Sequence, residues 1–235
     1  MKIEVLYSDF LLYGERGNVE YLQKTFGSEN VIKTQLNDRP YFADNKVDFI
    51  YMGPMTEKQL EMVTEKLLPF KDKLKSMIEE GTYFLIVNSA LEIFGRFIEL
   101  ENGFRLKTLD LLPFTTMRNM SKRHDVAVLG SFNDIQVIGY DARFTEQFGN
   151  EEMPFLKVER GYGFSKKSLL EGVHYKNFFG TNLLGPILIT NPPLMKLFKK
   201  ALTGTENLPF EKDVVKAYEV RLDKFQNDKE FVNQH

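Results

Sequence analysis

The sequence predicts an α/β protein with a doubly wound sheet, and three observations support this. Short apolar strands alternate with segments of helical periodicity through residues 1–96. The run at residues 83–87, YFLIV, is continuously apolar, as expected for a strand buried on both faces of a parallel sheet. Residues 97–191 then change to short strands separated by turns rich in Gly and Asn. A β-rich second half should therefore follow the βαβ half.

The predicted elements of the first half follow in order along the chain. We expect strands at residues 3–8, 31–36, 47–53 and 83–87. A helix is expected at residues 17–27, which carry apolar residues at helical spacing and end on a glycine. Residues 56–80 also read as helix, interrupted near Pro69 and closed by Gly81.

The C-terminal segment returns to helix. Pro192 and Pro193 mark the start of one helix, and a charged stretch at residues 211–232 has a thinner apolar stripe. No repeat or linker divides the chain, so we expect a single domain over residues 1–235. Within it we distinguish a βαβ half (1–96), a β-rich half (97–191) and C-terminal helices (192–235).

Composition excludes several classes of function. The 31 basic and 33 acidic residues are mixed along the chain with a net charge of −2, so a nucleic-acid partner is not expected. The absence of cysteine excludes disulfides and a thiolate nucleophile. No apolar run approaches the roughly 18 residues that a membrane helix needs, and the first residues do not resemble a signal peptide. We therefore expect a cytoplasmic protein without a membrane span.

No motif predicts a cofactor or a metal. The run LYGERGN before the first helix lacks the glycine spacing of a dinucleotide or phosphate-binding loop, and we interpret it as a turn and a helix start. The three histidines, His124, His174 and His235, are scattered without the paired spacing of a zinc site. We expect His124 to lie in a polar turn and His174 to be a partly buried, hydrogen-bonded side chain.

Several stretches together carry a resemblance to a known family. They are DFLLYGERGN, DFIYMGP, the strand-turn-helix around Asn88, RGYGFSKKSLLEGVHYKNFFGT and GTNLLGPIL. In combination they resemble the class I glutamine amidotransferases. Within these they resemble the CobB/CobQ-like (cobyric-acid-synthase-like) branch, which includes the amidotransferase subunit of lipid II isoglutaminyl synthase. The resemblance implies a flavodoxin-like sheet and a bacterial role in peptidoglycan biosynthesis.

The resemblance also implies a site, and this chain departs from it at three places. In the family, the sharp turn between a strand and the following helix, here called the elbow, carries a cysteine that attacks glutamine. A histidine activates this cysteine. The cysteine matches Asn88 and the histidine matches Leu184, so neither catalytic group is intact. The family's glycine-rich oxyanion turn matches Gly53, Pro54 and Met55, and proline has no N–H to donate. These changes together indicate a pseudoenzyme, so we lean against enzymatic activity.

Other residues lie at or near the former pocket. Asn88 suits the turn because asparagine tolerates positive φ, or it could cap the following helix. Ser89 is one residue away from the nucleophile position. Glu92 replaces a family glutamine and should bring a carboxylate near the pocket. Arg143, with Asp141, falls where the family lines its glutamine pocket, but we expect a surface salt bridge there.

Three hypotheses of function follow from the sequence. The first is a non-catalytic subunit that binds a synthetase-type or ligase-type protein, with residues 9–18 and the C-terminal helices as available surfaces. The second is a small-molecule binding or sensing protein that uses a remodelled pocket between Gly53, Asn88 and Leu184. The third is residual amidotransferase or hydrolase activity through Ser89. An open pocket would favour the second hypothesis, and a pocket filled by Met55 and Leu184 would favour the first.

Overall fold

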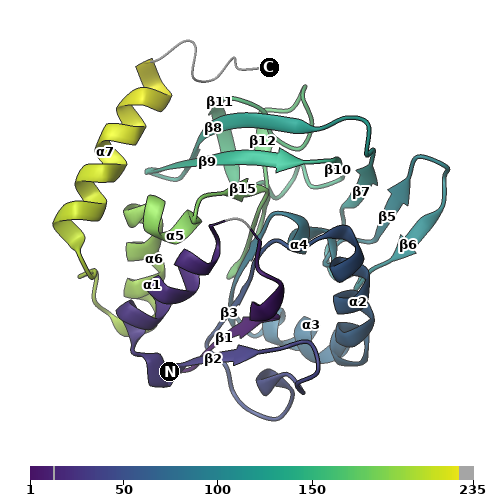
Figure 1. Ribbon diagram of the computed structural model, residues 1–235, viewed down its shortest axis with the longest axis horizontal. Coiled ribbons are helices and arrows are strands. Elements are labelled where there is room, and N and C mark those ends of the chain that lie inside the picture. The colour runs from purple at the N-terminus through teal and green to yellow at the C-terminus, as the bar shows by residue number, and fades with distance from the viewer. Residues whose placement is uncertain (13, 228–235) are drawn as a thin grey trace.

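A computed structural model describes residues 1–12 and 14–227 of the chain, and Figure 1 shows its layers. The central sheet has six strands in the order β13-β14-β4-β3-β1-β2. All neighbours in it are parallel except β13, which runs antiparallel to β14. The strands are β1 (Ile3–Leu6), β2 (Val31–Thr34), β3 (Phe49–Met52), β4 (Tyr83–Val87), β13 (Val173–Tyr175) and β14 (Phe178–Thr181).

Helices cover both faces of this sheet, as the doubly wound prediction required (Figure 1). One face carries α1 (Arg16–Phe26), α6 (Pro192–Thr203) and, further out, α7 (Glu211–Asn227). The other face carries α2 (Glu57–Leu67) and α3 (Lys71–Glu79). Short helical turns complete the set: η1 (Ser8–Phe10), η2 (Ser28–Asn30), η3 (Tyr41–Ala43), η4 (Leu68–Phe70), α4 (Ser89–Glu92) and α5 (Ile187–Thr190).

Strand alternation divides the core into two apolar layers. On β4, Leu85 and Val87 join the cluster under α1 and α6, whereas Phe84 and Ile86 join the cluster under α2 and α3. All four side chains are fully buried. Because successive side chains of a strand point to opposite faces, a continuously apolar strand is what a sheet covered on both sides requires.

Two smaller sheets form the β-rich second half, together with β13 and β14. One has the order β10-β7-β5-β6 and the other β12-β11-β8-β9-β15. Figure 1 shows the second of these across the top of the central sheet. The strands are β5 (Phe97–Leu100), β6 (Arg105–Lys107), β7 (Thr115–Arg118), β8 (His124–Phe132), β9 (Ile135–Arg143), β10 (Thr145–Phe148), β11 (Leu156–Arg160), β12 (Leu170–Glu171) and β15 (Leu183–Leu184).

The α/β prediction is confirmed, with local differences. The predicted break near Pro69 is real, because η4 separates α2 from α3. Residues 187–190, expected as extended chain, instead form α5. The last predicted helix is described as far as Asn227, so its predicted end at residues 228–232 lies outside the described residues.

Candidate functional site

The elbow after β4 has the geometry that the sequence predicted. The chain leaves β4 at Val87, turns at Asn88 with φ 56° and ψ −129°, and enters α4 at Ser89. A non-glycine residue in this region is strained and persists only where its surroundings hold it. Here the main-chain N–H of Asn88 donates to the Thr181 carbonyl at 2.6 Å. The elbow is therefore fastened to β14.

The Asn88 side chain acts as a hydrogen-bond donor inside the protein. Its amide nitrogen donates to the Asn182 carbonyl at 2.7 Å and lies 3.5 Å from the Ala142 carbonyl. The residue is 4% exposed. An amide nitrogen shares its lone pair with its own carbonyl group, so this side chain positions the turn and has no nucleophile to offer. No side-chain cap joins Asn88 to α4, so the capping alternative is wrong.

Leu184 lies in an apolar setting. It belongs to β15, where it pairs with Tyr140 of β9, and it is 7% exposed. Its side chain belongs to the same apolar cluster as Leu11 and Val87. Leucine has no group that could accept a proton. The following Gly185-Pro186 peptide bond is cis.

The turn after β3 is filled and tied to the elbow. A Cβ placed on Gly53 would lie 2.5 Å from Leu11 Cδ2, so the Leu11 side chain occupies the space beside this glycine. The Ser89 hydroxyl accepts from the Met55 N–H at 3.0 Å and donates to the Met55 carbonyl at 2.8 Å. The Pro54 carbonyl accepts from the Leu12 N–H. Because Gly53, Pro54 and Met55 are all buried, this turn lies beneath other side chains.

A buried carboxylate that sequence reasoning missed holds the segment after Leu184. Glu15 accepts from the Gly185 N–H at 2.9 Å, from the Tyr51 hydroxyl at 2.9 Å and from the Asn18 amide. The Asn18 side-chain oxygen accepts from the Leu188 N–H at 2.8 Å. Burial raises the pKa of Glu15. In the sequence these residues read only as a turn before a helix, because their partners lie about 170 residues away.

Glu92 reaches the interior one turn beyond the elbow. Its carboxylate pairs with Arg118 at 3.1 Å and accepts from the Thr145 hydroxyl at 3.2 Å. The Glu92 side chain is 5% exposed and the Arg118 side chain is 6% exposed. Burial raises the pKa of Glu92, and the Arg118 guanidinium opposes that rise. No sequence feature pointed to Arg118 as its partner.

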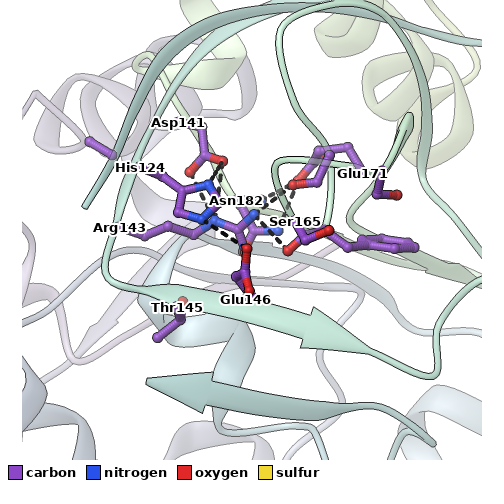
Figure 2. A network of polar contacts seen from close by, with 12 residues as sticks. His124, Asp141, Arg143, Thr145, Glu146, Ser165, Glu171 and Asn182 are labelled. Carbon is purple, nitrogen blue, oxygen red and sulfur yellow. Dashed lines mark hydrogen bonds and ion pairs between the residues drawn. The ribbon is translucent and has the colours of Figure 1, made fainter. Parts of the chain in front are cut away.

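The prediction of a surface salt bridge at Asp141 and Arg143 is wrong, because both side chains are buried (Figure 2). Arg143 Nε lies 3.0 Å from Asp141 Oδ1, and its Nη2 donates to the Gly163 carbonyl at 2.6 Å. The physical reason is that Asp141 and Arg143 point to the covered face of β9, where Arg143 also reaches the Phe164 carbonyl, whereas Tyr140 on the opposite face is 44% exposed. Burial raises the pKa of Asp141, and the Arg143 guanidinium opposes this.

His124 is also buried, and its predicted polar turn is wrong: it opens β8 and is 3% exposed. Its Nδ1 lies 3.8 Å from Asp141 Oδ2, and its Nε2 lies 3.6 Å from Glu146 Oε1. Burial, followed by the charges of Arg143 and Lys166, lowers the pKa of His124 to about 4. The imidazole is therefore neutral near pH 7, and neither contact is then an ion pair.

Glu171 is linked to the elbow through Asn182, and Figure 2 shows these two side chains together. Its carboxylate accepts from the Thr181 hydroxyl at 2.9 Å, the Asn182 N–H at 2.6 Å and the Asn182 amide at 3.1 Å. Asn182 in turn accepts from Asn88. Burial raises the pKa of Glu171 to about 7. A carboxyl that titrates near neutral pH thus lies two hydrogen bonds from the elbow.

The remaining histidines follow the sequence expectations in part. His174 is half-buried against the rings of Phe132 and Phe179, and burial lowers its pKa. His235 lies outside the described residues. No group of three or more acidic, histidine or cysteine side chains that could hold a metal is found within residues 1–12 and 14–227. No helix in that part of the chain is long and apolar enough to cross a membrane.

Comparison with known proteins identifies the family of the chain. Residues 2–192 match the model of the CobB/CobQ-like glutamine amidotransferase domain. Two curated relatives are both named "Lipid II isoglutaminyl synthase (glutamine-hydrolyzing) subunit GatD". The one from Staphylococcus aureus is 26% identical over 205 residues, covering 85% of this chain and 83% of the relative. The one from Streptococcus pneumoniae is 24% identical over 202 residues, covering 83% and 77%.

Solved structures show the same fold at lower identity. A crystal structure of a glutamine amidotransferase superposes with a TM-score of 0.59 at 12% identity, covering 87% of this chain and all of that chain. The PurLQS structure from Thermotoga maritima superposes with a TM-score of 0.52 at 11% identity, covering 94% and 98%.

Proposed function

This chain belongs to the family of CobB/CobQ-like glutamine amidotransferase domains, and we propose that within it the chain is a non-catalytic subunit of an amide-forming synthetase complex. The observation that carries the proposal is the Asn88 amide, which occupies the elbow and donates to the Asn182 carbonyl. Glutamine hydrolysis at an elbow requires a nucleophile there and a base beside it. Asn88 supplies neither group, and Leu184 is apolar.

The packing around the elbow supports the same proposal. Met55 is 4% exposed and Leu184 is 7% exposed, and Leu11 fills the space beside Gly53. Pro54 has no N–H to stabilise an oxyanion. A filled site favours the subunit over a small-molecule sensor that would bind between Gly53, Asn88 and Leu184.

Residual activity through Ser89 has less support. Its hydroxyl hydrogen is directed at the Met55 carbonyl, and its oxygen already accepts from the Met55 N–H. A serine nucleophile needs a neighbouring base to remove that proton, and no titratable side chain is hydrogen-bonded to Ser89 among the described residues.

A synthetase-type or ligase-type protein is the partner we propose. Both curated relatives are named as a subunit of lipid II isoglutaminyl synthase. By analogy, we infer a role in amidation of a cell-wall precursor, in the cytoplasm, with no cofactor bound by this chain and no nucleic acid. Residues 9–18 are one proposed contact surface, with Arg16 exposed at the start of α1.

Two measurements test the proposal. The tagged chain, expressed in its native host, should recover an ATP-dependent amide-forming ligase, identified by mass spectrometry. Arg16→Glu should reduce the recovery, and Lys107→Glu on β6 is the matched control, because Lys107 is exposed on another part of the chain. The purified chain, alone and with that partner, should release no ammonia from glutamine. Recovery of no such ligase, or ammonia release that Ser89→Ala abolishes, would overturn the proposal.

A further inference from the structure

The hairpin of β5 and β6 carries the one asparagine of this sequence that is followed directly by glycine. Asn102 and Gly103 lie in the connection between the two strands, and both residues are exposed. β6 is an outer strand of its sheet and pairs with β5. Figure 1 shows this hairpin at the margin of the molecule. The Asn-Gly pair is therefore accessible to water and to bases dissolved in it.

The glycine leaves the asparagine side chain open to attack by the main chain. The nitrogen of the residue after an asparagine can close a ring onto the side-chain carbon Cγ, and a side chain on that residue hinders the approach. Gly103 has no side chain, and a Cβ placed on it would find no atom within 4 Å. Its φ is 79°, which glycine adopts without strain. The packing around Gly103 therefore leaves room for the ring to form.

Hydrogen bonds close the turn and set the condition for this attack. The Gly103 N–H donates to the Leu100 carbonyl at 2.9 Å, and the Leu100 N–H donates to the Phe104 carbonyl at 2.8 Å. Asn102 Oδ1 accepts from the Phe104 N–H at 3.0 Å. Because the Gly103 nitrogen is engaged as a donor, the turn must open before it can attack. Such opening is local, since exposed loops and outer hairpins belong to the least stable parts of a fold.

We propose that Asn102 is a site of spontaneous deamidation. In the opened turn, the Gly103 nitrogen attacks Asn102 Cγ, so that an N–Cγ bond forms and the Cγ–Nδ2 bond breaks. The proton of the Gly103 nitrogen passes through solvent to Nδ2, which leaves as ammonia. Water then opens the cyclic succinimide: addition at Cγ gives aspartate, and addition at the main-chain carbonyl carbon gives isoaspartate. Water is the co-reactant, and nothing is oxidised or reduced.

The two products should affect the hairpin differently. Aspartate keeps a side-chain oxygen in the place where Asn102 Oδ1 accepts from the Phe104 N–H. Isoaspartate instead carries the main chain through Cγ, which lengthens the main chain by one carbon atom. The hydrogen bonds of Leu100 with Gly103 and Phe104 then lose their geometry. The isoaspartyl product should therefore loosen the pairing of β5 with β6.

A second exposed hairpin turn supplies the comparison. Asn133 and Asp134 connect β8 to β9, both residues are exposed, and Asn133 has a φ of 51°. Here the residue after the asparagine carries a side chain, so its nitrogen reaches Cγ less readily. Asn133 should therefore keep its amide under conditions that convert Asn102. The reaction uses no glutamine and does not depend on the chain being a non-catalytic subunit.

Peptide mapping by mass spectrometry, after incubation of the full chain in mildly alkaline buffer, tests the proposal. Asn102 should convert before Asn133. Gly103→Ala should slow the conversion of Asn102 at least about tenfold, which is about 1.4 kcal/mol in activation free energy. Asp134→Gly is the matched variant, because it creates an Asn-Gly pair in the other turn, and Asn133 should then convert as well. The same comparisons in urea, where neither turn exists, separate the effect of the following side chain from that of turn stability.

Hydrogen exchange over residues 97–107 tests the effect on the hairpin. The isoaspartyl chain, separated by chromatography, should exchange faster there than Asn102→Asp, which has the same charge and an unchanged main chain. A blank without glutamine separates the ammonia of this reaction from that of a glutaminase. The proposal fails if the folded chain keeps its Asn102 amide, if Asn133 converts first, or if Gly103→Ala reacts in urea as fast as the unchanged sequence. Equal exchange in the two chains would contradict the loosening of the hairpin.

Discussion

The Asn88 amide donates a 2.7 Å hydrogen bond to the main-chain carbonyl of Asn182, and this contact fastens the strained elbow to the residue that follows β14. Glu171 holds Asn182 from the other side through its N–H and its amide. The elbow is therefore the end of a buried chain of hydrogen bonds.

Asn88→Ala should destabilise the protein by about 2 kcal/mol, because it removes a buried hydrogen bond and leaves a Cβ at positive φ without compensation. Asn88→Gly should cost less, since glycine adopts φ 56° without steric strain but still loses the bond to Asn182. Urea unfolding of the two variants measures the difference. An alanine variant as stable as the glycine variant would contradict the role given to the strained turn.

Restoring the two family residues should not restore glutaminase activity. The double variant Asn88→Cys/Leu184→His would supply a thiol and an imidazole, but Pro54 still offers no N–H to an oxyanion and Leu11 still fills the space beside Gly53. Ammonia release from glutamine should stay at the level of the buffer blank. The variant must first be shown to be folded by circular dichroism. Measurable turnover in a folded variant would mean that the turn after β3 is not an obstacle.

Replacing Glu92 alone should lower the free energy of unfolding more than replacing Glu92 and Arg118 together. Glu92→Met should destabilise the protein by about 3 kcal/mol or more, because it leaves the Arg118 guanidinium buried. Among the described residues, its remaining ion-pair partner is then Glu61 at 3.8 Å. Glu92→Met/Arg118→Met should recover most of that loss, since no uncompensated charge is left. Thermal or urea unfolding of the three proteins forms the comparison. A double variant less stable than the single one would show that the pair itself stabilises the fold.

Glu171 should make the protein less stable as pH rises toward neutrality. Burial raises the pKa of its carboxyl from about 4.5 in the unfolded chain to about 7, so between these values the folded state binds more protons than the unfolded state. The free energy of unfolding then falls with pH in this window, by up to about 1.4 kcal/mol per pH unit.

Glu171→Gln is the matched variant, because its amide can still donate to Thr181 and accept from Asn182. It should remove this part of the pH dependence. Urea unfolding at several pH values between 4.5 and 7 gives the slope for both proteins. If the slopes of the two proteins are equal, the carboxyl does not titrate as described.

The central sheet could be predicted from the sequence because its signals are local. The continuous apolar run of β4, the break at Pro69 and the two prolines before α6 each act within a few residues. The elbow was predictable for the same reason, as small residues follow an apolar strand. α5 was not predicted, because ILIT is as apolar as a strand and no polar residue reveals a helical period.

The buried polar clusters could not be predicted, because their partners are distant in sequence. Asp141 and Arg143 stand two residues apart with opposite charges, a pattern that also fits an exposed strand. They are enclosed by residues about 20 positions further along the chain, since Arg143 donates to the Gly163 and Phe164 carbonyls. His124 looked exposed because Ser121, Lys122 and Arg123 precede it, whereas its own side chain turns inward at the start of β8.

Glu15 joins the start of α1 to the segment after Leu184 through a buried hydrogen bond. It directly precedes α1, is fully buried beneath the exposed Arg16, and accepts a hydrogen bond from the Gly185 N–H directly after Leu184. Asn18 adds a second attachment one turn later, at Leu188. The first turn of α1 and residues 185–188 are therefore joined at two points, on the side of the chain that follows Leu184.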